Sequence, residues 1–294
     1  MEKIYYFHAG VARQIIDADK TERSHVEVSL DLNMSVATFP LQDHNLVLEG
    51  GVMPVADLEP LLSAGNKVFR YTDKRLAPIE VRADGYYKLV PTSSVPTLEI
   101  NGIKMHRSKD IAPLEDARLK TELVVRSGNH VLDTCGGLGY SALFAVKAGA
   151  RTVVSTEKSP AVLKIRRQNP WVCPGAFDWF TPEAAHRINL VQGDINSFIT
   201  TLPDNSFDAV VHDPPRFCSA TGDLYGKAFY GQLARVMRNG ARLFHYTGSP
   251  KKIVHQDRFI QNAMKRLDLA GFYKISFNDH LQGIYAEKNT RILA

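Results

Sequence analysis

The sequence contains little that points to a disulfide framework, a metal cluster or a membrane. It has only three cysteines, Cys135, Cys173 and Cys218, and no two of them form a C-x-x-C pair. An odd and scattered set predicts a reduced protein without structural zinc. No apolar run reaches the roughly 18 residues of a membrane-spanning helix, and the N-terminal MEKIYYFHAG lacks the apolar core of a signal peptide. We therefore expect a cytoplasmic protein with no transmembrane helix and no metal site.

A strong charge of one sign is also missing overall, but the charges are unevenly distributed. The chain has 36 basic and 31 acidic residues, a net charge of +5. Residues 1–120 contain 15 Lys and Arg against 17 Asp and Glu, whereas the remainder contains 21 against 14. A polyanionic partner would suit this basic second part, although solvated helix faces explain the same surplus equally well.

The first part of the chain has short, alternating apolar patterns. Residues 25–32 read as a strand, and residues 77–91 and 95–107 read as hairpins that turn at Asp-Gly and Asn-Gly. The pattern predicts a small β-rich N-terminal domain over residues 1–110. A helical linker is expected over residues 111–128.

After residue 128 the pattern changes to strands that alternate with helices. This alternation predicts an α/β domain over residues 129–294, with a doubly wound, Rossmann-like parallel sheet. The tail, residues 272–288, reads as a hairpin, so one of its strands must run antiparallel to its neighbour. The expected strands are 130–135, 152–157, 188–194, 207–213 and 241–247, and the expected helices are 141–149, 160–169 and 227–240.

Ligands of such sheets bind at the carboxyl ends of the strands, and four expected strand ends carry acids. Asp133 precedes Gly137 and Gly139, whose lack of a side chain allows a tight turn and a close approach to a ligand. Glu157 ends the second strand, where a carboxylate can accept two ribose hydroxyls. Asp194 and Asp213 end the next two expected strands, and Asp194 is placed to meet an adenine edge.

The spacing Gly137-x-Gly139-x-x-Ala142 also fits the dinucleotide fingerprint. However, Asp133 would repel a pyrophosphate, whereas it suits the cationic amino group of a methionine moiety. A dinucleotide site also has no use for the Asp-Pro-Pro sequence that begins at Asp213.

Residues 128–290 resemble the class I methyltransferases that use S-adenosylmethionine. VLDTCGGLG looks like their D-x-G-x-G-x-G loop, with Cys135 in place of the first glycine. Glu157 matches their ribose-binding acid and Asp194 their adenine-side acid. The predicted cofactor-binding set is therefore Asp133, Thr134, Cys135, Gly137, Gly139, Glu157, Lys158, Asp194 and Ile195.

The run DPPRF, residues 213–217, resembles the [DNS]-P-P-[YFW] motif of enzymes that methylate exocyclic amines. The resemblance implies that Asp213 accepts one N–H of the target amine and the Pro214 carbonyl the other, while Pro214 and Pro215 stiffen the loop. Arg216 stands where the motif has an aromatic residue. Either Phe217 stacks on the base one position later, or Arg216 stacks or holds a phosphate.

The longer run MHR…VLDTCGGLGY…NPW…HDPPRF…LFHY resembles a set of predicted archaeal methyltransferases. Within that set the resemblance points to a ribosomal RNA cytosine-N4 methyltransferase, and thus to structured RNA as partner. Arg107 is a candidate for the cofactor carboxylate, and His245 and Tyr246 are candidates to border the pocket. The oligomeric state stays open.

Several alternatives remain. A transfer RNA guanine-N2 methyltransferase would use the same motif. Aminopropyltransferases, which make polyamines, share this fold and an N-terminal β domain, but resemble a GGGDG first loop and an acidic pocket. Cytosine-C5 chemistry would need a cysteine after a proline on the Asp213 loop, and neither Cys135 nor Cys218 qualifies. An RNA-binding factor that has lost catalysis is the remaining possibility.

Overall fold

A computed structural model describes residues 3–219, 221–248 and 256–289. The chain divides into two compact units. Unit 1 consists of Met1–Pro113 and Lys164–Ala176, and unit 2 of Leu114–Leu163 and Phe177–Ala294. Helix α2 (Pro113–Val124), which we expected to be part of a linker, therefore belongs to unit 2 except for its first residue.

Unit 1 is built from short antiparallel strands. They pair in the orders β1-β6-β7, β2-β3-β4-β5 and β11-β10-β9-β8. The β10–β11 hairpin turns at the expected place, where Asn101 and Gly102 both have a positive φ, as a two-residue turn of this kind needs. The elements are β1 (Tyr5–Phe7), α1 (Ala9–Lys20), β2 (His25–Val28), β3 (Ala37–Gln42), β4 (Asn45–Leu48), β5 (Gly51–Pro54), the 3₁₀ helix η1 (Val55–Ser63), β6 (Phe69–Thr72), β7 (Arg75–Pro78), β8 (Glu80–Arg82), β9 (Tyr86–Val90), β10 (Thr97–Ile100) and β11 (Ile103–Lys104).

Helix α1 was not anticipated from the sequence. Its residues Val11, Ala12, Ile15 and Ile16 are buried in the core of unit 1, at the spacing of one helix face. The side chain of His8 caps the helix by accepting from the Gly10 N–H at 3.1 Å. This periodicity was present in the sequence, but it lies within a stretch that otherwise reads as strands.

Residues 164–176 follow the first half of α4 (Pro160–Arg166) and pack with unit 1. The indole N–H of Trp171 donates to the Leu32 carbonyl at 2.8 Å, and the Tyr6 hydroxyl donates to the Gln168 carbonyl at 3.1 Å. We had expected this segment inside the α/β domain. Contacts across about 140 residues of sequence decide its place, and such contacts leave no local signal.

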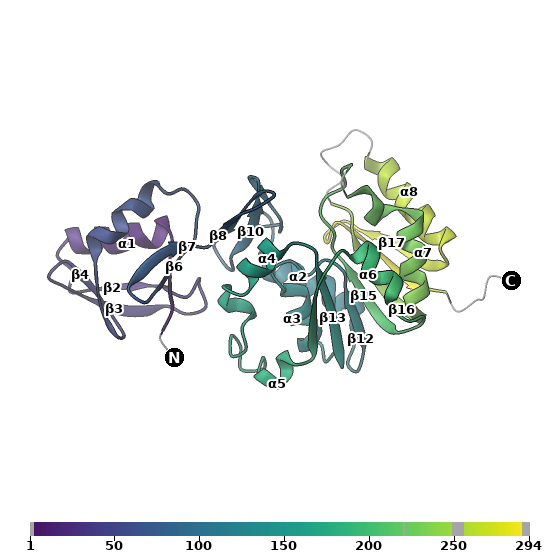
Figure 1. The fold of residues 1–294 in the computed structure, drawn as a ribbon, viewed down its shortest axis with the longest axis horizontal. Coiled ribbons are helices and arrows are strands. Elements are labelled where there is room, and N and C mark those ends of the chain that lie inside the picture. Colours follow the sequence, from purple (N-terminus) through teal and green to yellow (C-terminus); the bar gives the residue numbers. More distant parts are fainter. Residues whose placement is uncertain (1–2, 220, 249–255, 290–294) are drawn as a thin grey trace. The chain divides into compact units, whose positions relative to one another are not determined.

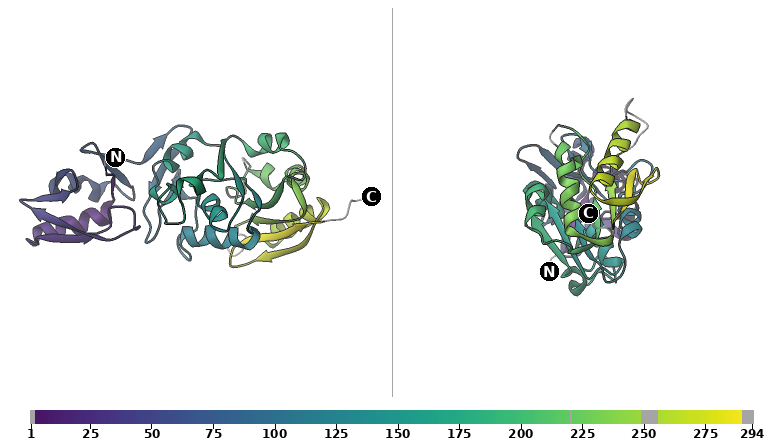
Figure 2. Two further views of the ribbon diagram at one scale, coloured as in Figure 1. Left: turned by 90° about the horizontal axis from the view of Figure 1, so that it is seen from below. Right: turned by 90° about the vertical axis from the view of Figure 1, so that its right-hand side faces the viewer.

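Unit 2 contains a seven-stranded sheet in the order β14-β13-β12-β15-β16-β18-β17. Strand β18 runs antiparallel to both β16 and β17, and the other pairs are parallel. This confirms the predicted α/β, Rossmann-like sheet and its C-terminal antiparallel hairpin, the yellow strands of Figure 2. The elements are β12 (His130–Asp133), α3 (Tyr140–Lys147), β13 (Thr152–Glu157), α5 (Pro182–Ala185), β14 (Ile188–Gln192), α6 (Ile195–Thr201), β15 (Phe207–His212), η3 (Gly222–Tyr225), α7 (Lys227–Val236), β16 (Met237–Tyr246), α8 (Gln256–Leu269), β17 (Phe272–Asn278) and β18 (Gly283–Lys288); the 3₁₀ turn η2 (Pro170–Val172) lies in unit 1.

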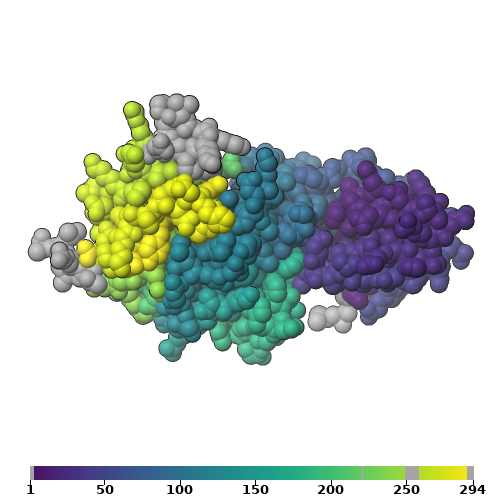
Figure 3. All heavy atoms as spheres, turned by 180° about the vertical axis from the view of Figure 1, so that it is seen from behind, coloured from purple at the N-terminus to yellow at the C-terminus, as the bar shows by residue number. Residues whose placement is uncertain are grey.

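Helices cover both faces of this sheet (Figure 1). Side chains alternate along the strands, so Leu132 and Val210 pack beneath α6, α7 and α8, while their neighbours Val131 and Ala209 pack beneath α2, α3 and α5. The sheet is thus buried on both faces, which is why its central strands read as continuous apolar runs. On the surface in Figure 3, the teal residues of α2 lie beside the yellow hairpin.

The expected helix over residues 227–240 was wrong at its C-terminal end. Helix α7 ends at Val236, and Met237 pairs with Phe207 as the first residue of β16. Met237 is fully buried in the sheet core. Asn239 and Gly240, which we took as the helix stop, lie within β16 at an irregular register, because burial of Met237 favours strand pairing over another helical turn.

Candidate functional site

The predicted site residues converge where the parallel strands of unit 2 end. Asp133 of β12 is opposite Ser155 of β13 and Val211 of β15. His212, the last residue of β15, is opposite His245 of β16. Because parallel strands end at the same edge of a sheet, the loops after β12, β13, β14 and β15 surround one region.

The loop after β12 has the open backbone that the glycines predicted. Gly137 has φ +47°, and no atom lies within 4 Å of the position that a Cβ would take. Gly139 has φ +93° and is the N-cap residue of helix α3. Cys135 keeps a negative φ, so its replacement of a glycine causes no backbone strain. Burial, together with the nearby Glu157, raises the pKa of its thiol, which opposes a role as nucleophile.

Glu157, at the end of β13, is held by backbone groups. Its Oε2 accepts from the Gly137 N–H at 3.0 Å, and its Oε1 accepts from the Ser159 N–H at 2.8 Å. The side chain thereby joins the β12 loop to the β13 loop. Each carboxylate oxygen can accept a further hydrogen bond, so this half-buried group stays suited to the predicted ribose hydroxyls.

Asp133 is placed differently from the other strand-end acids. It is 0% exposed, and its Oδ2 accepts from the Ser155 hydroxyl at 2.8 Å. In this conformation it reaches no solvent, so the predicted contact with an amino group of the cofactor would require a rearrangement. The neighbouring Thr134 is also buried.

Asp194 caps helix α6 and forms an ion pair with Lys158. Its Oδ1 accepts from the Asn196 N–H at 2.9 Å, and its Oδ2 is 2.9 Å from the Lys158 Nζ. Burial works to raise the pKa of Asp194, but the Lys158 ammonium and the Asn196 N–H outweigh it and hold the pKa below its usual value. The structure thus brings two predicted cofactor residues together, whereas the predicted Ile195 is buried in the core.

Asp213, directly after β15, is paired with a buried lysine of α2. Its Oδ2 lies 2.8 Å from the Nζ of Lys120, which also lies 2.7 Å from Oδ2 of Asp116. Lys120 is 4% exposed, whereas the Asp213 side chain is 32% exposed. Burial works to lower the pKa of Lys120, but the carboxylates of Asp213 and Asp116 outweigh it and raise the pKa, so the ammonium stays charged.

The aromatic ring of Tyr246 supports this ion-pair cluster. The Lys120 Nζ lies 4.2 Å from its ring centroid, a cation–π contact. Burial, together with the Asp213 carboxylate, raises the pKa of the Tyr246 hydroxyl. We predicted that Tyr246 borders the pocket, and the structure places it against the partner of Asp213.

The Asp-Pro-Pro loop is held at its second proline. The Tyr225 hydroxyl donates to the Pro215 carbonyl at 2.8 Å. Pro214 is buried, whereas Pro215, Arg216 and Phe217 are exposed. Phe217 is 55% exposed, and its ring lies 5.5 Å from that of Tyr225. An exposed ring on a fixed loop is available for stacking on a planar ligand.

A buried polar network connects the β12 loop to the β15 loop behind this site. His212 Nε2 faces the Leu224 carbonyl at 3.0 Å, so Nε2 carries the proton and Nδ1 accepts from the Thr134 hydroxyl at 2.7 Å. Burial lowers the pKa of His212 to about 4. His245 stacks on it at 4.5 Å and bonds the Tyr230 hydroxyl at 2.8 Å. His245 is therefore a buried support, although we expected it to border the pocket.

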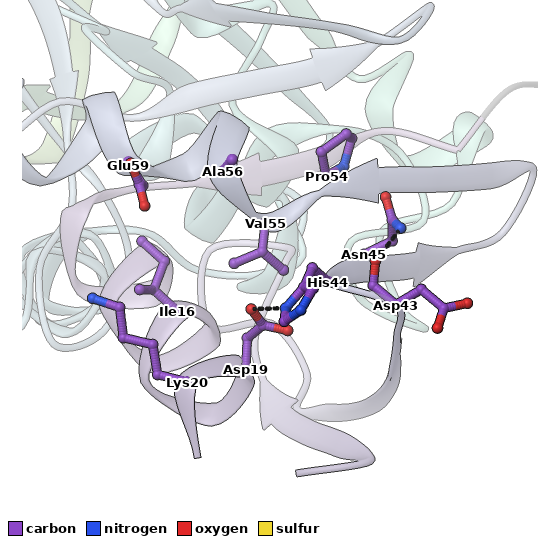
Figure 4. Close-up of a pocket in the computed structure, with 10 residues that line it drawn as sticks. All are labelled: Ile16, Asp19, Lys20, Asp43, His44, Asn45, Pro54, Val55, Ala56 and Glu59. Carbon is purple, nitrogen blue, oxygen red and sulfur yellow. Dashed lines mark hydrogen bonds and ion pairs between the residues drawn. The ribbon is translucent and has the colours of Figure 1, made fainter. Parts of the chain in front are cut away.

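Arg107 belongs to unit 1, so its predicted contact with the cofactor carboxylate stays a prediction. Unit 1 also has a hollow of about 370 Å³ between α1 and the β3–β4 turn (Figure 4). There the Asp19 carboxylate points toward His44 at 3.0 Å. The His44 side chain is 86% exposed, and its bond to Asp19 raises its pKa. None of the predicted strand-end residues lines this hollow.

Sequence reasoning missed Lys120, Asp116 and the roles of His212 and Tyr225. Asp116 and Lys120 are four residues apart on α2, which is the spacing of an ion pair on one helix face. That spacing was visible, but it usually marks a solvated face. Only the position of α2 against the end of β15 turns it into part of the site.

Searches for similar proteins give few matches by sequence and many by fold. No family model matches the chain. The uncharacterized protein MJ1233 of Methanocaldococcus jannaschii is 36% identical over 274 residues, which cover 93% of this chain and 88% of that protein. Among the described residues no helix is long and apolar enough to cross a membrane, and no group of three His, Cys, Asp or Glu side chains could hold a metal.

Two of the solved structures with a similar fold are spermidine synthases. A spermidine synthase in complex with the transition-state analogue AdoDATO superimposes with a TM-score of 0.55 at 16% identity, covering 72% of this chain and 73% of that one. Spermidine synthase from Thermotoga maritima gives a TM-score of 0.54 at 16% identity, with 72% of each chain covered. At this identity the likeness shows the fold alone, an α/β Rossmann-like fold. It also covers more than the residues of unit 2 alone.

Proposed function

The chain belongs to the family of the uncharacterized protein MJ1233, and we propose that it is an S-adenosylmethionine-dependent methyltransferase. Its proposed substrate is an exocyclic base amine of structured RNA, namely cytosine N4 of ribosomal RNA. The observation that carries the proposal is the Asp213 carboxylate. It is fixed at the end of β15 by a buried lysine and is followed by a proline loop that Tyr225 holds in place.

The strand ends fit the cofactor. Gly137 leaves open space above the β12 loop, and Glu157 presents a carboxylate that backbone N–H groups hold in position. Asp194 and Lys158 would meet the adenine side. When bound, S-adenosylmethionine supplies an electrophilic methyl group on a sulfonium sulfur. The fold likeness to a spermidine synthase in complex with AdoDATO supports a ligand of this type.

Asp213 and Pro214 would make the amine reactive. The lone pair of an exocyclic amine is delocalised into its ring, so the nitrogen has to become more like an sp³ amine before it can attack. Asp213 accepts one N–H and the Pro214 carbonyl the other, and both acceptors are in place before charge grows on the nitrogen. As the N–C bond forms and the S–C bond breaks, the nitrogen becomes cationic. It then loses a proton to solvent next to Asp213.

Phe217 and Arg216 would hold the base. Phe217 is an exposed ring beside Tyr225 and Phe259, and exposed aromatic rings stack on unpaired bases in RNA-binding sites. The excess of basic residues after position 120 suits a phosphate backbone. The choice of cytosine N4 over the guanine N2 of transfer RNA follows the resemblance of the longer sequence run.

Aminopropyl transfer to a polyamine is the second candidate. The spermidine synthase likeness extends beyond the α/β unit and favours it. Polyamines, however, are cations, and the acceptor carboxylate here already has a lysine ammonium 2.8 Å away. That ammonium offsets the attraction of Asp213 for a protonated amine, whereas it does not oppose a neutral base amine.

Methyl transfer from labelled S-adenosylmethionine would test the proposal. The protein would be incubated with ribosomal RNA, ribosomal subunits, transfer RNA, free nucleosides or spermidine. We expect label on cytosine in ribosomal RNA or subunits. Label on transfer RNA guanine would select the guanine-N2 alternative, and calorimetry showing binding of NADH but not of S-adenosylmethionine would exclude both.

A further inference from the structure

We propose that Lys120 is a positioning residue for Asp213 and that it restricts the acceptor site to neutral amines. This inference rests on the proposed function, because it concerns how the same carboxylate receives its substrate. Lys120 is a buried charge in direct contact with Asp213: it is 4% exposed, and its ammonium lies 2.8 Å from Asp213 Oδ2.

Lys120 fixes one oxygen of Asp213. Its ammonium lies 2.8 Å from Asp213 Oδ2, and within the described part of the chain no donor to Oδ1 is found. A carboxylate on a loop can otherwise rotate about its side-chain bonds. With Oδ2 committed to Lys120, Oδ1 keeps one orientation, toward which a substrate N–H can be aligned.

Lys120 is itself held from two other directions. Asp116, one helical turn earlier on α2, lies 2.7 Å from the ammonium and is equally buried. The Tyr246 ring of β16 lies 4.2 Å from it. A lysine that only solubilised a helix would extend into water. This one is constrained by α2, by the β15 loop and by β16, so its position is determined before any substrate arrives.

The same ammonium discriminates between nucleophiles by charge. An amine that donates to Asp213 Oδ1 contacts the same carboxylate as the Lys120 ammonium and therefore lies close to it. At such a separation like charges repel strongly in a partly buried site. A base amine is uncharged and pays no such penalty. A protonated polyamine meets this repulsion as well as the attraction of the Asp213 and Asp116 carboxylates, so Lys120 weakens its binding and biases the site toward neutral amines.

The variant that tests this must not leave a buried carboxylate without its cation. Lys120→Met alone would leave the buried Asp116 carboxylate without its cation, and the protein could fail to fold. Asp116→Asn with Lys120→Met removes the buried pair together and leaves Asp213 intact. Asp116→Asn alone retains the Lys120–Asp213 pair. Lys274→Met is the matched control, since it removes a lysine ion pair with Glu287 on the exposed surface of β17.

The first readout is turnover on RNA with and without Asp213. The Asp116→Asn/Lys120→Met pair should lower kcat by roughly 10- to 100-fold and leave the cofactor Kd within about twofold, because positioning acts on the reacting complex. In an Asp213→Ala background the same pair of changes should lower kcat by less than about twofold, because a residue that acts only through Asp213 has nothing left to position. An equal fall in both backgrounds would show a merely structural role and overturn the proposal.

The second readout is calorimetric binding of spermine to the protein saturated with S-adenosylhomocysteine, and it needs no RNA activity. The Asp116→Asn/Lys120→Met variant should bind spermine at least about tenfold more tightly than the unchanged protein, and Lys274→Met should not. Equal spermine affinity in the unchanged protein and the double variant would overturn the selectivity. If the unchanged protein labels no RNA, the proposed function fails, while this arm still decides the role of Lys120.

Discussion

Two strand ends of the same sheet hold their acids in different ways. Glu157, at the end of β13, is held by the backbone N–H groups of Gly137 and Ser159. Asp213, at the end of β15, is held by the side chain of Lys120, which is 93 positions away in sequence. A backbone cradle depends on loop shape, whereas an ion pair depends on where a separate helix packs. In the proposed function, the β13 end holds the cofactor and the β15 end positions the target amine.

Replacing Asp213 should impair catalysis at the β15 end and leave the β13 end unaffected. We expect Asp213→Ala to lower kcat by about a hundredfold or more, because a preorganised acceptor acts mainly in the transition state. Cofactor affinity should stay nearly unchanged. Steady-state kinetics with calorimetry of S-adenosylmethionine measures both. A variant that lost cofactor affinity and kept its rate would place Asp213 on the cofactor side instead.

Replacing Glu157 should have the opposite pattern. Glu157→Ala should weaken S-adenosylmethionine binding by roughly 1–3 kcal/mol, the usual cost of losing hydrogen bonds to a charged group. At saturating cofactor kcat should change much less. Gln at the same position retains one acceptor oxygen and serves as the graded control. If Glu157→Ala bound the cofactor as tightly as the unchanged protein, the ribose assignment would be wrong.

His212, the last residue of β15, joins the β12 loop to η3, through the Thr134 hydroxyl on one side and the Leu224 carbonyl on the other. Burial lowers its pKa to about 4 from the ordinary 6.5, so the folded state favours the neutral ring. The stability that the neutral ring contributes is complete above the unfolded pKa and is lost as the pH falls from about 6.5 toward 4. The loss reaches about 2 kcal/mol at pH 5. His212→Gln should therefore lose less stability than the unchanged protein between pH 7 and pH 5.

Urea unfolding at pH 7 and pH 5 measures this difference. His44→Gln is the control, because His44 is exposed and its bond to Asp19 raises its pKa. Its contribution has the opposite sign: it is present at low pH and is lost as the pH rises. The buried His245 leaves some acid sensitivity in His212→Gln. Identical pH dependence in His212→Gln and the unchanged protein would mean that the ring has the same pKa in the folded and the unfolded state, and would contradict its burial as a neutral group.

The smallest expected effect concerns the partner of the β15 end. If that partner is RNA held by Arg and Lys, log Kd should rise linearly with log salt, by roughly 0.7 per single-strand phosphate contact. Changes in the exposed Arg216 should reduce that slope by about one contact. Filter binding across a salt series measures it. A flat salt dependence would contradict contacts to phosphates.

The sequence predicts those parts of the site whose contacts join residues close together in the chain. The open β12 loop, the Glu157 strand end and the Asn101-Gly102 turn all depend on residues within a few positions of one another, and they are as predicted. Strand alternation likewise predicted the sheet and its antiparallel tail. These features have local causes, in the backbone freedom of glycine and the two-residue period of a strand.

The rest depends on packing between distant segments. In the sequence, Asp116 and Lys120 have the spacing of an ordinary surface ion pair. They become part of the site only because α2 packs against the end of β15. The sequence predicts Met237 at the end of a helix. In the structure it is buried beside Phe207 and begins a strand. Asp133 has the expected position, yet Ser155 on the next strand holds it away from solvent. In each case the partner is fixed by the fold and not by the neighbouring sequence.

The central claim, methylation of an RNA base amine at Asp213, is tested most directly by nucleoside mass analysis. Ribosomal RNA from cells with the gene would be compared with that from cells without it, after complementation with the unchanged protein or Asp213→Ala. We expect N4-methylated cytidine to disappear without the gene, to return with the unchanged protein and not to return with Asp213→Ala. Unchanged RNA nucleosides together with an altered polyamine content would contradict it.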